Sequence, residues 1–456
     1  MAQFDGSVRS DAALHGPRAG GGLCDPRAQQ RLAAAARTGN GQVTAAPPAL
    51  PTPALDGIRV IEICTTIAGP ACGRLLADFG ADVIKIESPD GDPVRQLGSL
   101  VDDVALYSTS ILRGKRSIVV DLKSPQGLQI AMDLVMTADV VLENNRPGVL
   151  ERLGLGYEQV AKVKPGIVYV RISGYGQDGP YSQLPGYGAI CEAFGGVRHM
   201  TGDPDRPPSR VALATTDYLS SVYAAFGLLA ALRHRDRTGE GQMVDVALYE
   251  AAFSQMESVV PAYDKLGTVP MRQGPNLPSM SPNSLYPTRE GGFLLIAANS
   301  KATYERLVAV MERPDLLTDP RYATIRKRGE QANMRALDAT VAAWTSEHDG
   351  TELETRLQAA GVPASRVFTV QDIFDDPHYR ARGMLTQVAH PTLGHVTQIG
   401  VVPRLSATPG RIRHSGPELG ADTEQVLRDE LALTPEVIAS LVQAGVVHGV
   451  TQVQSL

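Results

Sequence analysis

The sequence predicts an α/β fold in which helices cover both faces of a mostly parallel sheet. Three observations lead to this prediction. From Leu55 onward, glycine, proline and helix-capping residues punctuate the chain at regular intervals. Residues 58–88 read as strand, helix and strand, which is a complete βαβ unit. The same alternation then continues to residue 173, and strands that alternate with helices form parallel sheets.

The elements of this part follow one another closely. The first unit consists of the strand 58–64, a short helix 69–80 that stops at Gly80, and the strand 81–88. Ser124 is the expected N-cap of the next long helix, with Pro125 at its first position. The other expected elements here are strands over 116–123, 139–145 and 167–173 and helices over 126–138 and 157–166.

The middle of the chain differs from the first part in composition and in its pattern of elements, which predicts a smaller α+β domain. Residues 265–283 are rich in Pro, Gly and Ser, residues 284–300 resemble a hairpin, and helical stretches follow. A last helix begins after Thr434 as N-cap. We expect a disordered extension over 1–53, the first part of a large domain over 54–255, a linker over 256–283, the small domain over 284–365, and a linker and return to the large domain over 366–456.

The extension is inferred from composition. Residues 1–53 are rich in Ala, Gly, Arg and Pro, contain no Lys or Glu, and lack the apolar core of a secretory signal. Their arginines leave a transit peptide as the alternative.

Composition excludes several classes of protein. The formal net charge of −6 argues against a nucleic-acid binder. No apolar run approaches the ~18 residues of a membrane span. Four cysteines without a CxxC pair favour a reducing cytoplasm over a disulfide scaffold, and the nine histidines form no zinc motif.

Three motifs that resemble functional sites have simpler structural interpretations. Residues 174–179, GYGQDG, match GxGxxG, but Pro180 and turn sequence follow where a dinucleotide site requires a helix. Cys191 has no base beside it and is expected to be a buried thiol. Residues 237–242 are expected to form a surface turn before a strand.

Asp217 is the most informative candidate. It precedes a helical apolar stripe within 215–232. It is either an N-cap that accepts a hydrogen bond from an amide one turn in, or a carboxylate held ionised by the helix dipole that attacks an activated acyl group. Spacing alone leaves both interpretations open.

Several motifs in order resemble the class III CoA-transferases, the CaiB/BaiF or formyl-CoA transferase-like family. They are AGP with LLADFGADVIKIE, then RGKRSIVVDLKSPQG, ENNRPGVLERLGLGYE and ISGYGQDGP, then TTDYLSSVYAAFGLLAAL and DDPHYRARGM. The resemblance spans about residues 54–430. It implies a Rossmann-like large domain built from both chain ends, a smaller central domain, and an interlocked homodimer.

The resemblance also implies a reaction. Acyl-CoA and a small carboxylic acid would be the substrates, with no permanently bound cofactor, no metal, and no nucleic-acid or membrane partner. Asp217 would be the catalytic residue, passing through a mixed anhydride and an enzyme-bound CoA thioester. The residues implied to bind CoA are Ala68, Lys123, Asn144, Arg146, Arg152 and Tyr187.

Departures from the family's branches limit the substrate prediction. Ile67, Ser88 and a single Gly274 stand where the formyl-CoA branch has a Gln, an Arg and a glycine run, so oxalate chemistry is not expected. The racemase branch has a His and a Glu where this chain has Tyr187 and Ser300. A racemase and a non-catalytic subunit of a heteromeric transferase are the alternatives.

Overall fold

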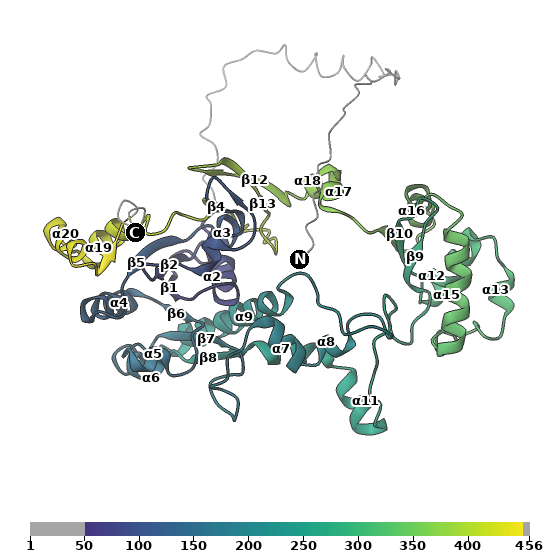
Figure 1. Ribbon diagram of the computed structural model, residues 1–456, viewed down its shortest axis with the longest axis horizontal. Helices are drawn as coiled ribbons and strands as arrows, with labels where there is room; N and C mark the ends of the chain where they lie inside the picture. Colours follow the sequence, from purple (N-terminus) through teal and green to yellow (C-terminus); the bar gives the residue numbers. More distant parts are fainter. Residues whose placement is uncertain (1–50, 450–456) are drawn as a thin grey trace, which may run out of the picture. The chain divides into compact units, whose positions relative to one another are not determined.

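A computed structural model describes residues 51–449, which form the elements shown in Figure 1. The predicted extension over 1–53 therefore lies almost entirely outside the described residues. The largest feature is a seven-stranded sheet with the order β14-β5-β2-β1-β6-β7-β8. Its strands are β1 (Arg59–Ile63), β2 (Asp82–Glu87), β5 (Arg116–Val120), β6 (Val140–Glu143), β7 (Val168–Ser173), β8 (Met243–Ala247) and β14 (Val447–His448).

The predicted mostly parallel sheet is confirmed. All neighbouring strands pair in parallel except β14, which adds to the edge antiparallel to β5. Strand order reverses beside β1: β2 and β5 follow on one side, and β6, β7 and β8 on the other. Ligands of open α/β sheets bind at this kind of switch point, outside the carboxyl ends of the strands.

Helices cover both faces of the sheet. Alternate residues of each strand point to opposite faces, so both faces present apolar side chains that pack against helices. Ile61 and Ile84 pack against one group of helices, and Val60 and Val83 against the other. The first group is α4 (Pro125–Thr137), α6 (Tyr157–Val163), α19 (Thr423–Leu431) and α20 (Pro435–Gln443). The second is α2 (Ala68–Asp78), α7 (Gly188–Phe194), α9 (Thr215–Thr238) and α10 (Leu248–Phe253).

Two helix N-caps predicted from the sequence, Ser124 and Thr434, are confirmed. The Ser124 hydroxyl accepts from the Gly127 amide at the start of α4. The Thr434 hydroxyl accepts from the Val437 amide at the start of α20. Short elements complete this part: η1 (Pro93–Gln96), β3 (Leu100–Val101), β4 (Val104–Ala105), α3 (Leu106–Ile111), α5 (Val149–Arg152) and α8 (Val197–Met200).

A second, three-stranded sheet has its own core. Its order is β11-β10-β9, all antiparallel, and the predicted hairpin over 284–300 is β9 and β10. Tyr286, Leu307 and Leu337 are buried in this core. Its elements are β9 (Asn283–Pro287), β10 (Phe293–Ala297), α12 (Lys301–Val310), α13 (Asp315–Thr318), α14 (Ile325–Arg328), α15 (Gln331–Thr345), α16 (Gly350–Ala359) and β11 (Ala364–Arg366).

The segments on either side of this second sheet carry structure of their own. The predicted linker over 256–283 contains the helix α11 (Val259–Leu266), which follows η2 (Ser254–Met256). After β11 come α17 (Val370–Asp375), α18 (Pro377–Ala381) and the hairpin of β12 (Leu385–His390) and β13 (Gly394–Ile399). The Gln398 side chain donates to the Thr109 carbonyl, so the hairpin is attached to α3.

Candidate active site

A cavity of about 220 Å³ lies at the carboxyl ends of β6 and β7 and the start of α2. It coincides with the switch point of the sheet. Five of the residues singled out from the sequence meet there, from segments up to about 150 positions apart. They are Ala68, Asn144, Arg146, Tyr187 and Asp217.

Asp217 is not the N-cap of its helix, so that interpretation was wrong. Helix α9 begins at Thr215 with Ala214 at the N-cap, and Asp217 is the third helical residue. No side-chain capping bond is made there. Thr215, Thr216 and Asp217 can all cap a helix, and local sequence does not decide which of them does. The carboxylate is therefore free of a capping role and lines the cavity.

Burial sets the charge state of Asp217. Removal of the carboxyl from water raises its pKa to about 6, although its own backbone amide and the Arg210 cation favour the charged form. Burial outweighs these two contributions. A carboxylate that is partly stripped of water and ionised at neutral pH is suited to nucleophilic attack.

Gly188, the first residue of α7, lies directly against this carboxylate. A Cβ added at Gly188 would stand 2.1 Å from Oδ2 of Asp217. With a side chain at this position, either the carboxylate or the start of α7 would have to move. The absence of a Cβ at Gly188 therefore leaves room for the carboxylate in its observed position.

Residues 65–68 form a turn that lines the cavity. The Asn144 side chain clamps it, because its Oδ1 accepts from the Thr65 amide at 2.9 Å and its Nδ2 donates to the Thr65 carbonyl at 2.8 Å. The Ser221 hydroxyl donates to the Ala68 carbonyl at 2.7 Å and so ties α9 to the start of α2. Asn144 thus shapes the wall, a role that the resemblance did not indicate.

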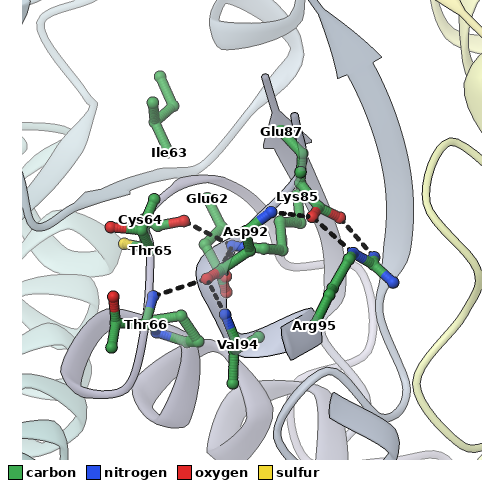
Figure 2. Close-up of polar contacts among 12 residues, drawn as sticks. Glu62, Ile63, Cys64, Thr65, Thr66, Lys85, Glu87, Asp92, Val94 and Arg95 are labelled. Atoms are coloured by element: carbon green, nitrogen blue, oxygen red, sulfur yellow. Dashed lines mark hydrogen bonds and ion pairs between the residues drawn. The ribbon is translucent and has the colours of Figure 1, made fainter. Parts of the chain in front are cut away.

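A buried network of charges also contacts the turn 65–68 (Figure 2). Oδ1 of Asp92 accepts from the amides of Thr66 and Val94 at 2.8 and 2.9 Å, and Oδ2 pairs with Nζ of Lys85 at 2.9 Å. Lys85 also pairs with Glu62 at 3.1 Å, and Glu62 with Lys115 at 2.6 Å. Burial opposes the charge on Lys85, but Glu62 and Asp92 outweigh burial and raise its pKa.

Thr66 shows why the turn needs this support. Its φ of +69° lies in the left-handed region, which a β-branched residue adopts only at a cost. The amide of Thr66 points at Asp92, and the hydrogen bond helps to offset that cost. Neither Asp92 nor Lys85 was identified from the sequence, because their contacts to the turn arise only when β1 and β2 pair.

Replacing Asp92 by Ala is expected to destabilise the fold by about 3–5 kcal/mol, because the buried cations of Lys85 and Lys115 would then share the single carboxylate of Glu62. It also releases the Thr66 amide, so the KM for acyl-CoA should rise. Urea denaturation and steady-state kinetics measure the two effects. Asp56→Ala is the control, since Asp56 is exposed, lines neither cavity and has no ion pair with a described residue. Equal behaviour of the two variants would remove Asp92 from this role.

A second cavity, of about 420 Å³, lies beside the first over the ends of β1, β2 and β5. Lys123 lines it, and Thr65 and Asn145 line both cavities. The two cavities therefore adjoin along the carboxyl edge of the sheet. Arg152, by contrast, is exposed at the end of α5 and lines neither cavity.

The other motifs fit their simpler interpretations. No helix starts within GYGQDG, and the next one begins at Gly188. Cys191 is buried, its Sγ donates to the Gly174 carbonyl, and burial raises its pKa to about 11. Within residues 51–449, no group of three His, Cys, Asp or Glu side chains is placed to hold a metal ion, and no helix combines the length and apolarity needed to cross a bilayer.

The structure is that of an α/β protein with a cavity at the switch point of a doubly wound sheet. Residues 55–423 match the family model of CoA-transferase family III. The chain therefore belongs to this family and is a CoA-transferase, as the resemblance predicted.

Known relatives support the same assignment. The chain is 43% identical to succinyl-CoA–D-citramalate CoA-transferase of Chloroflexus aurantiacus over 389 residues, 85% of this chain and 96% of that protein. It is 36% identical to the succinyl-CoA–L-malate CoA-transferase alpha subunit of the same organism over 391 residues, 85% and 91% of the two chains. A CaiB/BaiF family protein from Brucella suis superposes with a TM-score of 0.73 at 33% identity, covering 83% of this chain and all of that one.

Proposed function

We propose that the enzyme transfers CoA from succinyl-CoA to a short dicarboxylic acid, with Asp217 as the nucleophile. One observation carries the proposal: among the described residues that line the switch-point cavity, Asp217 supplies the only carboxyl group. The substrate class comes from the relatives, since D-citramalate and L-malate are both dicarboxylates.

The proposed reaction needs no energy source beyond the thioester. A carboxylate oxygen of Asp217 attacks the donor's carbonyl carbon, the C–S bond breaks, and CoA leaves as a thiolate. The thiolate attacks the aspartyl carbonyl of the mixed anhydride, which releases the donor acid and leaves an aspartyl-CoA thioester. The acceptor carboxylate attacks that thioester, expels the CoA thiolate and forms a second mixed anhydride with Asp217. The thiolate then attacks the acceptor's carbonyl carbon in this anhydride, which gives the CoA ester of the acceptor and frees the Asp217 carboxylate.

CoA is proposed to lie along the two adjoining cavities. The thioester would occupy the cavity at Asp217, where Ala68, Asn144 and Tyr187 form the walls. Arg146 and Lys123 would meet the phosphates, to which their cations are suited. Arg152 lines neither of these two cavities, and its proposed contact with CoA rests on the resemblance alone.

The homodimer is also proposed, on the resemblance and on strongly exposed apolar side chains. Tyr187, which lines the cavity, and Leu213 and Phe226, which lie four and nine positions from Asp217 in the chain, each expose more than two thirds of their surface. An interface between subunits would cover such side chains.

Trapping tests the covalent route. After incubation with succinyl-CoA, hydroxylamine is expected to convert the activated Asp217 carbonyl to a hydroxamate, which peptide mass spectrometry detects. Enzyme without donor, and Asp217→Asn with donor, are the controls and should remain unmodified. Turnover of the donor by an enzyme whose Asp217 stays unmodified would exclude the aspartyl intermediates.

A panel of carboxylate acceptors assayed with succinyl-CoA tests the overall reaction. The purified chain alone should form the CoA ester of the acceptor. Activity only after addition of a second polypeptide would instead support a subunit of a heteromeric transferase, the arrangement that the name of the L-malate relative indicates.

The racemase alternative lacks a second base. No histidine is among the described residues that line the cavity. Ser300 caps α12 by accepting from the Thr303 amide. Two-sided proton exchange at an α-carbon requires an acid and a base. Incubation of a 2-methylacyl-CoA in deuterated water should therefore leave the α-position unlabelled.

A further inference from the structure

The turn that follows β6 carries three side chains of the candidate active site. Asn144, Asn145 and Arg146 all line its cavity. Gly148 then leads the chain into α5, with a φ of +85° in the left-handed region. We name residues 144–148 the β6 turn. Whatever holds the β6 turn therefore sets the positions of three cavity side chains.

Glu143, the last residue of β6, is hydrogen-bonded to the β6 turn. It is fully buried, and its Oε2 accepts from the Asn145 amide at 2.7 Å. The Asn145 side chain in turn donates to the Ile63 carbonyl at the end of β1, at 3.1 Å. Glu143 therefore fixes the backbone of the turn at the position between Asn144 and Arg146.

Arg171 keeps the Glu143 carboxylate in place. It lies opposite Glu143 on the neighbouring strand β7, and its Nε donates to Oε1 of Glu143 at 2.8 Å. Its Nη1 pairs with Oε1 of Glu151 in α5 at 2.7 Å. Since Glu143 precedes the β6 turn and Glu151 follows it, one guanidinium joins the two ends of the turn. We call these three residues the brace.

Burial and geometry suit the brace to positioning. The side chain of Arg171 is 7% exposed and that of Glu143 is 1% exposed. A buried ion pair adds little net stability relative to apolar side chains of similar size. The planar guanidinium instead presents its donors in fixed directions, so the carboxylates that it binds are held in one orientation. The brace is therefore better suited to holding a turn in place than to stabilising the fold.

The same row of strands holds a second turn at the cavity, residues 174–179. Asp245 of β8 lies opposite Arg171 in the sheet, and its Oδ2 accepts from the Gln177 amide at 2.9 Å. Gly174 of this turn lines the cavity. The motif GYGQDG is thus anchored by a carboxylate of the neighbouring strand, and Arg171 lies between the side chains that anchor two cavity turns.

We propose that Arg171 is a positioning residue for CoA binding: through Glu143 it holds the β6 turn in the geometry that CoA requires. The inference rests on the proposed function, in which Asn144 and Arg146 face CoA. Arg171 and Glu143 line neither cavity, so they act through the turn and not by touching the substrate. Their effect should therefore fall on the affinity for CoA and not on the chemical step at Asp217.

Glu143→Gln is the first test, because it keeps the shape of the side chain but leaves one oxygen for which Arg171 and the Asn145 amide compete. KM for succinyl-CoA should rise by about 10-fold, as for loss of one charge-assisted hydrogen bond, while kcat and KM for the acceptor stay within about 2-fold. Arg171→Lys should give an intermediate KM, since lysine keeps the charge but lacks the planar fork that bridges two carboxylates.

Asp78→Asn is the matched control for the loss of a buried charge. Both carboxylate oxygens of Asp78 accept from Arg113, at 2.7 and 3.0 Å, the side chain is 2% exposed, and it lines neither cavity. Urea denaturation should show comparable losses of stability in Asp78→Asn and Glu143→Gln, yet only Glu143→Gln should raise KM for succinyl-CoA. An equal rise of KM in both variants would overturn the proposal.

A double variant separates position from stability. Glu143→Leu combined with Arg171→Met replaces the buried pair by apolar side chains, a change that often restores stability. Glu151 is 35% exposed and stays solvated, but the Asn145 amide still lacks its acceptor. The free energy of unfolding should therefore recover relative to Arg171→Met alone, whereas KM for succinyl-CoA should remain raised. Recovery of KM together with stability would show that the brace serves the fold only.

Direct binding of CoA separates this inference from the proposed reaction. Isothermal titration with free CoA should show about 10-fold weaker binding to Glu143→Gln than to the native enzyme. If binding weakens but Asp217 is not trapped by hydroxylamine after incubation with the donor, the covalent route fails and the positioning role stands. If Asp217 is trapped and both enzymes bind CoA equally well, the positioning role fails alone.

Discussion

Replacing Asp217 by Asn should lower kcat/KM for CoA transfer by a factor on the order of 10³ or more, because an amide cannot form the anhydride and the remaining site only positions the substrates. The substitution keeps the size of the side chain in the space beside Gly188. The fold and oligomeric state should therefore persist, as measured by circular dichroism and size-exclusion chromatography.

The same variant should be more stable than the native enzyme above pH 7. In the folded state the pKa of Asp217 is raised to about 6, so ionisation of the buried carboxyl opposes folding. That cost, on the order of 2–3 kcal/mol, is fully present above pH 6 and disappears as the pH falls toward 4. The difference in Tm between Asp217→Asn and the native enzyme should shrink over the same range.

Asp236→Asn on the exposed end of α9 is the control for both measurements. It should leave kcat/KM and the pH dependence of Tm unchanged, because Asp236 is exposed to solvent. Native-like activity in Asp217→Asn would refute the mechanism. A loss of activity together with a fall in Tm at pH 8 would show that Asp217 supports the fold instead.

Local sequence was sufficient for most of the large sheet. The strand predicted at 139–145 is Val140–Glu143, and the helix predicted to start at Pro125 starts there. These elements are specified by capping residues and by periodicity over a few neighbouring positions, which can be read without tertiary contacts. The resemblance named Asp217 and Asn144 as site residues, and both line the switch-point cavity.

The residues that local sequence missed act over long separations. Asp92 reaches the Thr66 amide across 26 positions, and Gly188 meets Asp217 across 29. Such contacts depend on how strands pair and helices pack, and no spacing rule encodes them. Arg74 illustrates the opposite difficulty: an arginine in a helix reads as a surface residue, yet its Nε is buried and it has no ion pair with a described residue.

Gly188→Ala should lower kcat by about 10²-fold while leaving the fold intact. The added methyl would stand 2.1 Å from Oδ2 and 2.7 Å from Cγ of Asp217, so the carboxylate must rotate or α7 must shift. A displacement of roughly 1 Å at a reacting group is sufficient for a loss of this size. Alanine is also a better helix former than glycine, so the change in helix propensity should not lower the free energy of unfolding.

Ala189→Gly is the matched control, because it changes the next position of the same helix and does not face the carboxylate. It weakens α7 by roughly 0.5–1 kcal/mol of helix propensity, yet it should retain most of the activity. If α7 merely needed to be well formed, Ala189→Gly would be the more damaging change and Gly188→Ala would be neutral or beneficial. A large loss confined to Gly188→Ala, with hydroxylamine trapping of Asp217 lost in parallel, would show that the missing methyl group positions the nucleophile.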